Sequence, residues 1–381
     1  MTRFRRPPRI LLVAASLAGL GLLALTCATP RAVPRSAADM QIQSHPWFHE
    51  RHHADGGGFE NVYGAPRADF DLKALGWVLG HAFQQKTNVP PAVRPLDAAA
   101  LAVPPAGVRI TWIGHATMLL QLPGLTVLTD PMFSERASPV GFAGPEREVA
   151  LPLPVEALPP VDVVILSHDH YDHLDEASIQ ALEAHHQPLF LAPLGVDEIV
   201  LGWGGRRVVA LDWWQYVDVG PWRIHGTPAR HFSGRGLTNR DGTLWASYFL
   251  ESTDGAADVY FAGDTGYSEH FAEIRERLGL PEVVLMPIGA YRPRWFMEAV
   301  HVDPAEAVQA FLDLGGTHLV PIHWGTFDLA DEPLQEPPAL AREAARAHGL
   351  EDRLHLMEIG EVLELHAAAV PGAATAEPPG P

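Results

Sequence analysis

One cysteine, Cys27, is present in 381 residues. A single thiol excludes a disulfide framework and a zinc site built from cysteines, so histidine and aspartate are left as the candidate metal ligands. Positive charge is also scarce, because 27 lysines and arginines stand against 46 aspartates and glutamates and give a formal net charge of -19. This acidity repels a phosphate backbone, and the composition therefore predicts no nucleic-acid partner.

Histidine and apolar residues are plentiful by contrast. The chain contains 20 histidines, and 47% of its residues are hydrophobic. This composition supports an ample core, in one large domain or two small ones, together with a rich supply of imidazole ligands.

The first 28 residues are interpreted as a targeting or anchoring segment. Four arginines in residues 1–9 precede the uncharged apolar run Ile10–Cys27, as in export signals. Three interpretations stay open: a cleaved signal peptide, a lipidated Cys27, or a retained anchor just long enough to span a bilayer. All three place the domain outside the cytoplasm, and the prediction is an exported, membrane-associated protein on the periplasmic side of the cell envelope.

The remaining chain divides into three parts by composition. Residues 29–105 are rich in Pro, Gly, His and Arg, carry one predicted helix over residues 71–83, and are interpreted as an extension that wraps the domain. Residues 106–366 form the predicted hydrolase domain. The tail of residues 367–381 is rich in Ala, Pro and Gly and is predicted to be disordered.

Short apolar runs alternate with helical stretches from Val108 onward. The first predicted strands cover residues 108–114, 117–122 and 125–130, and later ones lie between the helices. Helices are predicted over residues 176–186, 269–278, 304–314 and 339–348. Such alternation predicts an α/β fold in which helices cover the sheets.

Four potential metal ligands follow one apolar run within six residues. The predicted strand over residues 163–167 leads directly to His168, His170, Asp172 and His173. A rigid strand end holds such ligands in place, and the turn can aim the first two at one metal and the last two at another. The alternative is a polar loop that contains three histidines by coincidence.

Three further predicted strands end in a ligand residue, namely His231, Asp264 and His323. We therefore expect all four loops to meet at one sheet edge. One metal would be held by His168, His170, His231 and Asp264, and the other by Asp172, His173, Asp264 and His323. Imidazole and carboxylate ligands without thiolate favour two Zn²⁺ ions, with Fe and Mn left open.

This ligand pattern resembles that of the metallo-β-lactamase superfamily. More narrowly, the strings TWIGHAT (Thr111–Thr117), FAGDTGY (Phe261–Tyr267), HVDP (His301–Pro304) and IHWGTF (Ile322–Phe327) resemble the N-acylphosphatidylethanolamine-hydrolysing phospholipase D family. The resemblance runs in order from about residue 108 to residue 330. It implies a four-layered αββα sandwich and a dinuclear hydrolase site.

The resemblance also implies a substrate and a membrane partner. The expected reaction is zinc-dependent hydrolysis of an N-acylphosphatidylethanolamine-like phospholipid to phosphatidic acid and an N-acylethanolamine. Two nearby cations lower the pKa of a shared water, and the bridging hydroxide would be the nucleophile, with Asp172 orienting it. His301 is implied to contact the lipid phosphate and assist catalysis, and Tyr171 is a candidate substrate contact because it lies between ligands.

Two alternatives stay open beside this function. One is a related metallohydrolase acting on a soluble phosphodiester or a lactone, because a dinuclear site alone does not choose between phosphorus and carbonyl carbon. The other is an envelope metal-binding protein without catalysis. A homodimer is also left open.

Other histidines and aromatic clusters are given structural interpretations. His115 is expected to make structural hydrogen bonds. His52, His53, His185 and His186 are expected at the surface. The clusters Trp213–Trp214 and Trp295–Met297 are expected in the core, with acyl-chain contact as the alternative.

Overall fold

The structure is a computed structural model that describes residues 40–64, 73, 76–77, 86–236, 238–253, 255 and 257–365. The predicted export segment of residues 1–28, most of the predicted helix over residues 71–83 and the predicted tail of residues 367–381 lie outside the described residues. None of the helices in the described part of the chain is long and apolar enough to cross a membrane.

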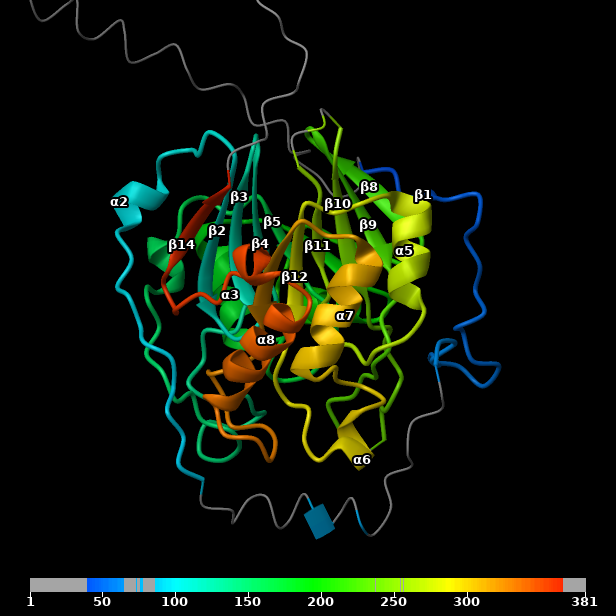
Figure 1. Ribbon diagram of the computed structural model, residues 1–381. Coiled ribbons are helices and arrows are strands. Elements are labelled where there is room, and N and C mark those ends of the chain that lie inside the picture. The colour runs from blue at the N-terminus through cyan, green and yellow to red at the C-terminus, as the bar shows by residue number, and fades with distance from the viewer. Residues whose placement is uncertain are drawn as a thin grey trace, which may run out of the picture. The chain divides into compact units, whose positions relative to one another are not determined.

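Two seven-stranded sheets lie at the centre of the fold (Figure 1). The first sheet has the order β14-β2-β3-β4-β5-β6-β7, antiparallel as far as β4 and parallel from β4 to β7. Its strands are β2 (Val108–Gly114), β3 (Thr117–Leu122), β4 (Leu125–Thr129), β5 (Val163–Ile165), β6 (Leu189–Pro193), β7 (Val208–Leu211) and β14 (Val362–Leu365).

The second sheet has the order β1-β8-β9-β10-β11-β12-β13 and is parallel only from β11 to β13. Its strands are β1 (Gln43–Ser44), β8 (Gln215–Val219), β9 (Trp222–Thr227), β10 (Ser247–Ser252), β11 (Val259–Phe261), β12 (Val283–Pro287) and β13 (His318–Ile322). Strands β1, β7, β8 and β14 were not among the predicted ones.

Helices cover the outer faces of both sheets, as Figure 1 shows. Helices α3 (Glu176–His185) and α4 (Val196–Gly202) lie on the first sheet. On the second sheet α7 (Pro304–Leu314) packs against β12, with α5 (His270–Leu278) and α8 (Glu336–Ala347) beside it. The short helices are α2 (Ala98–Leu101) and α6 (Arg294–Met297), with 3₁₀ turns at Val155–Ala157 and Glu351–Arg353. These four layers confirm the predicted αββα sandwich.

Strand β5 shows why the sequence forms this arrangement. Val164 packs with Ile179 and Leu182 of α3 in one buried cluster. Because side chains alternate along a strand, Val163 and Ile165 face the other sheet, and all three are fully buried. A strand that is covered on both faces has a continuous run of apolar residues in its sequence, instead of alternating apolar and polar residues.

Helix α7 begins and ends where the sequence predicts. The Asp303 side chain accepts hydrogen bonds from the N–H groups of Ala305 and Glu306, and the Glu306 side chain accepts one from the Asp303 N–H, which forms a capping box. Gly315, in the left-handed conformation at φ 70°, ends the helix. Helix α8 instead starts three residues before the predicted position, with prolines in its first turn, where a missing N–H breaks no helical bond.

The N-terminal extension contacts both sheets, with Leu101 of α2 packed in the core cluster of the first sheet and β1 at the edge of the second. Strand β1 pairs antiparallel with β8, and the N–H of His45 donates to the carbonyl of Trp214 at 3.0 Å. His52 is fully buried and hydrogen bonded to Asp212 at 2.6 Å, so the prediction of a surface position was wrong for this histidine. Its sequence neighbours are polar, and only the fold brings a buried carboxylate to meet it.

Candidate metal centre

Ligand residues gather where strands from both sheets end. Strand β5 of the first sheet leads to His168, while β9, β11 and β13 of the second sheet lead to His231, Asp264 and His323. The expectation of a single sheet edge was therefore wrong, because the loops meet across the sandwich. A site between two sheets can be enclosed from both sides.

The first set of ligands consists of three imidazoles that face one another. His170 Nδ1 lies 2.8 Å from His168 Nε2 and 3.2 Å from His231 Nε2. Asp264 Oδ2 lies 3.9 Å from His168 Nε2 and 3.7 Å from His231 Nε2. These four side chains are the ones expected to hold one metal ion.

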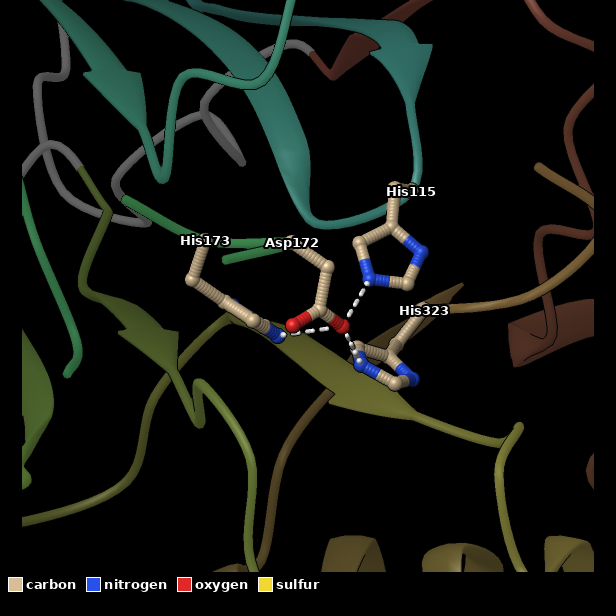
Figure 2. A group of neighbouring side chains, drawn as sticks. All are labelled: His115, Asp172, His173 and His323. Carbon is tan, nitrogen blue, oxygen red and sulfur yellow. Dashed lines mark hydrogen bonds and ion pairs between the residues drawn. The ribbon is translucent and has the colours of Figure 1, made fainter. Parts of the chain in front are cut away.

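The second set lies beside the first and shares Asp264 with it. Asp172 Oδ2 lies 3.5 Å from His173 Nε2 and 3.4 Å from His323 Nε2, as Figure 2 shows. The two oxygens of Asp264 lie 3.2 Å from the same nitrogens, Oδ2 from His173 Nε2 and Oδ1 from His323 Nε2. Asp264 thus stands between the two sets, and the structure brings all seven predicted ligand residues together.

The hydrogen bonds of the imidazoles show that the site suits a cation. The Nδ1 atoms of His168, His173 and His231 donate to Ser167 Oγ at 2.8 Å, to Asp130 Oδ2 at 2.7 Å and to the Val300 carbonyl at 2.9 Å. In the neutral imidazoles the Nε2 atoms carry lone pairs that point into the site. His173 Nε2 is buried with no hydrogen-bond partner, and a metal ion is the partner that such a donor set fits.

Asp130 supports both ligand sets, a role that the sequence reading missed. Its carboxylate accepts from His173 Nδ1 and also from Ser167 Oγ at 2.5 Å, and Ser167 in turn accepts from His168. One buried carboxylate therefore orients a ligand in each set. Asp130 directly follows β4, just as the ligands follow the ends of their own strands, and this position was the available signal of its role.

His115 is buried in contact with the ligands. Its Nε2 donates to Asp172 Oδ2 at 2.9 Å, and its carbonyl accepts from the N–H of His323 at 3.1 Å (Figure 2). Both His115 and His323 have positive φ, 53° and 59°. The contact therefore joins a loop of the first sheet to a loop of the second and fixes the position of Asp172.

The two predicted substrate contacts differ in position. His301 is buried, and its Nδ1 makes no hydrogen bond and lies 3.9 Å from Asp264 Oδ2. Tyr171 donates its hydroxyl to the carbonyl of Arg235 at 2.8 Å, and the Arg235 guanidinium lies 4.0 Å from the centre of its ring. His301 faces the ligands, whereas the Tyr171 hydroxyl is bonded to the loop that follows His231.

Protons and metal ions compete for part of this site. Burial lowers the pKa of His168 and His231 well below the usual value, so both are neutral ligands near pH 7. Burial also acts to lower the pKa of His323, but Asp264 and Asp172 outweigh it and raise the pKa to about 9. A metal ion must displace that proton, and metal affinity therefore falls as the pH falls.

A cavity of about 330 Å³ opens onto the metal centre. Its polar lining consists of His170, Asp172, Asp264, His301, His323 and Arg240. Its apolar lining consists of Phe232, Ala290, Phe296, Met297, Val300 and Leu329. The cavity therefore joins an apolar wall to a cluster of ligands. Trp213 and Trp214 are buried in the core as predicted, whereas Phe296 and Met297 face this cavity.

Comparison with known proteins agrees with this geometry. The sequence model described as a beta-lactamase superfamily domain matches residues 126–324, the part that carries all seven ligands. The chain belongs to the metallo-β-lactamase superfamily. This membership, together with the ligand cluster, makes the protein a metal-dependent hydrolase.

Members of the superfamily similar to this chain include two curated relatives. A Mycobacterium tuberculosis protein of uncharacterized function is 40% identical over 350 residues, which cover 87% of this chain and 89% of the relative. N-acyl-phosphatidylethanolamine-hydrolyzing phospholipase D 1 of Caenorhabditis elegans is 35% identical over 273 residues, 68% of this chain and 76% of the relative.

A solved structure of the superfamily shares the fold. The isothiocyanate hydrolase from Delia radicum gut bacteria is 26% identical, with a TM-score of 0.56, and the match covers 68% of this chain and all of that one. The fold of this chain is therefore shared with a solved hydrolase.

We predict that the variant Asp130→Asn binds zinc 10–100-fold more weakly, on the order usual for loss of an outer-shell carboxylate. The amide removes the charge that orients His173 directly and His168 through Ser167. Competition with a chromophoric chelator measures the affinity. The exposed variant Asp218→Asn is the control, and equal affinity of Asp130→Asn and wild type would contradict the role given to Asp130.

Proposed function

We propose that the protein is a zinc-dependent phosphodiesterase of the phospholipase D type, acting on N-acylphosphatidylethanolamine-like phospholipids. The observation that carries this proposal is the cavity, in which an apolar wall leads to the shared ligand Asp264. A lipid phosphodiester likewise has a polar part, the anionic phosphate, next to an apolar part, the acyl chains. The products would be phosphatidic acid and an N-acylethanolamine.

The size of the cavity fits part of such a lipid. About 330 Å³ is at the lower end of the range of small-ligand pockets. The phosphodiester and the adjoining part of a chain would occupy it, and the rest of the phospholipid would stay in the bilayer. Arg240, an exposed residue of the lining, supplies positive charge that suits the anionic diester.

The residues of the site have separate tasks in this reaction. Two zinc ions, when bound by the two ligand sets, supply Lewis acidity and activate water near neutral pH. Asp172, held by His115, orients the attacking water through its carboxylate. His301 faces Asp264 from the cavity wall and donates a hydrogen bond to a phosphoryl oxygen, where negative charge develops during attack.

The similarity to the phospholipase D of Caenorhabditis elegans supports the choice of substrate. We further propose that residues 1–28 export the domain and keep it at the membrane on the periplasmic side, next to its substrate. An enzyme that draws one lipid at a time from a bilayer gains from such attachment, because the local substrate concentration rises.

We predict that the purified, zinc-loaded protein converts N-acylphosphatidylethanolamine in a mixed lipid extract into phosphatidic acid and N-acylethanolamine in equal amounts. Mass spectrometry of the lipids before and after incubation measures both products. Hydrolysis of soluble diesters or lactones without any loss of this lipid would favour the alternative metallohydrolase. Metal binding without hydrolysis of any of them would favour the non-catalytic protein.

We predict that Phe296→Ser lowers lipid turnover by about tenfold to a hundredfold, because burial of a phenylalanine side chain against the acyl chain is worth about 1.5–3 kcal/mol. Hydrolysis of bis(4-nitrophenyl) phosphate, which has no acyl chain, should change about twofold at most. The variant Leu201→Ser, an exposed apolar residue outside the cavity, is the control. Parallel losses on both substrates would show that the apolar wall has no part in lipid recognition.

We predict that Asp264→Asn loses bound metal and turnover together, because the shared ligand loses its charge. Metal content by mass spectrometry and the lipid assay are measured on the same preparation. Asp352→Asn, an exposed carboxylate, should change neither. A fully active and fully metallated Asp264→Asn variant would contradict this assignment.

A further inference from the structure

A second cluster of metal-type ligands lies in the described part of the chain and shares no residue with the metal centre. It consists of His52, His53 and Asp212, whose ligand atoms all lie within 4.8 Å of one another. His52 Nε2 lies 2.6 Å from Asp212 Oδ1, and His53 Nε2 lies 2.8 Å from Asp212 Oδ2. Two parts of the chain about 160 positions apart thus meet at one carboxylate.

The cluster is enclosed on one side and open on the other. His52 is fully buried, and its ring stacks on Trp213 with centroids 4.1 Å apart. Asp212 follows β7, is 3% exposed and also accepts from the N–H of Trp213 at 2.7 Å. The side chain of His53 is 34% exposed. Solvent therefore reaches the cluster only along the His53 side of these three residues.

We propose that His52, His53 and Asp212 form a structural site for a divalent transition metal of the zinc class, separate from the metal centre. Two imidazoles and one carboxylate are a donor set that zinc accepts, and a water on the exposed side of His53 would complete four ligands. The ion would fasten the N-terminal extension to the hydrolase domain.

The geometry needs only a small change to accept such an ion. Zinc–nitrogen bonds of about 2.0–2.1 Å in a tetrahedron place neighbouring ligand atoms about 3.3 Å apart. The present separations of 2.6 and 2.8 Å must therefore open by about 0.7 and 0.5 Å. The Nδ1 atom of His52 is buried without a hydrogen bond. A neutral imidazole can place its proton there and leave the lone pair of Nε2 to the metal.

The segment that carries the two histidines continues to the metal centre. The His52 carbonyl accepts from the N–H of Glu60 at 2.9 Å, and the N–H of Phe59 donates to the Asp241 carbonyl at 2.8 Å. Asn61 then donates its side-chain N–H to the carbonyl of His231 at 2.6 Å. An ion held by His52 and His53 would therefore also restrain the loop that supplies a ligand to the catalytic ions.

The variant His53→Gln distinguishes a metal site from a plain hydrogen bond. Glutamine keeps an N–H donor for Asp212 but is a poor zinc ligand. We expect the full-length protein, equilibrated with zinc in excess and then dialysed, to hold one zinc ion more per chain than His53→Gln does. We also expect added zinc to raise the thermal midpoint of wild type more than that of the variant.

The control is His348→Gln, the same substitution at an exposed histidine outside both clusters, which should match wild type in both measurements. The same comparison is repeated in variants that also carry Asp264→Asn. This substitution lowers the amount of zinc held by the metal centre, so the extra ion is counted separately. Equal zinc content in wild type, His348→Gln and His53→Gln would overturn the proposal and leave a hydrogen-bonded histidine pair. Hydrolysis is not needed for this test, so it stands apart from the proposed phospholipase activity.

Discussion

Two carboxylates, Asp172 and Asp264, lie among buried imidazoles, and the arrangement of the metal centre depends on compensating their charge. An ionised carboxylate in a protein interior is costly without a positive partner. Burial acts to raise the pKa of Asp264, but His173 and His323 hold it well below the usual value. The carboxylate therefore stays charged, with either protonated histidines or metal ions as its partners. Low pH favours protonated histidines as these partners, and higher pH favours metal ions.

The backbone around the ligands is shaped by the need to bring them this close. A Cβ at Gly289 would lie 2.1 Å from the carbonyl oxygen of His323, and one at Gly263 would lie 2.6 Å from the Cβ of Ser167. Only glycine allows these loops to pack so tightly, Gly289 against a loop of its own sheet and Gly263 against a loop of the other sheet. The positive φ of His115 and His323 costs free energy, and the hydrogen bond between their backbones offsets part of that cost. Strain at the ligands is thus maintained by contacts between the two sheets.

The sequence predicted the ligands more accurately than their surroundings, for a physical reason. His168, His170, Asp172 and His173 follow a buried strand, and a local pattern of that kind is visible without knowledge of the fold. The orientation of these residues depends on Asp130 and His115, which lie far away in sequence and meet the ligands only when the sandwich forms. His52 was misjudged for the same reason, because burial by a distant strand leaves no periodic signal. Patterns in a single sequence carry no information about contacts between residues that are far apart in the chain.

Two residues that support the metal centre lie outside the part of the chain that carries the ligands. All seven ligands lie within residues 126–324, the part that matches the superfamily, whereas His115 and Asn61 precede it. His115 fixes Asp172, and Asn61 binds the carbonyl of His231. The part that matches the superfamily therefore determines that the protein is a metal-dependent hydrolase. Residues outside that part restrain one ligand in each set, Asp172 through His115 and His231 through Asn61 of the N-terminal extension.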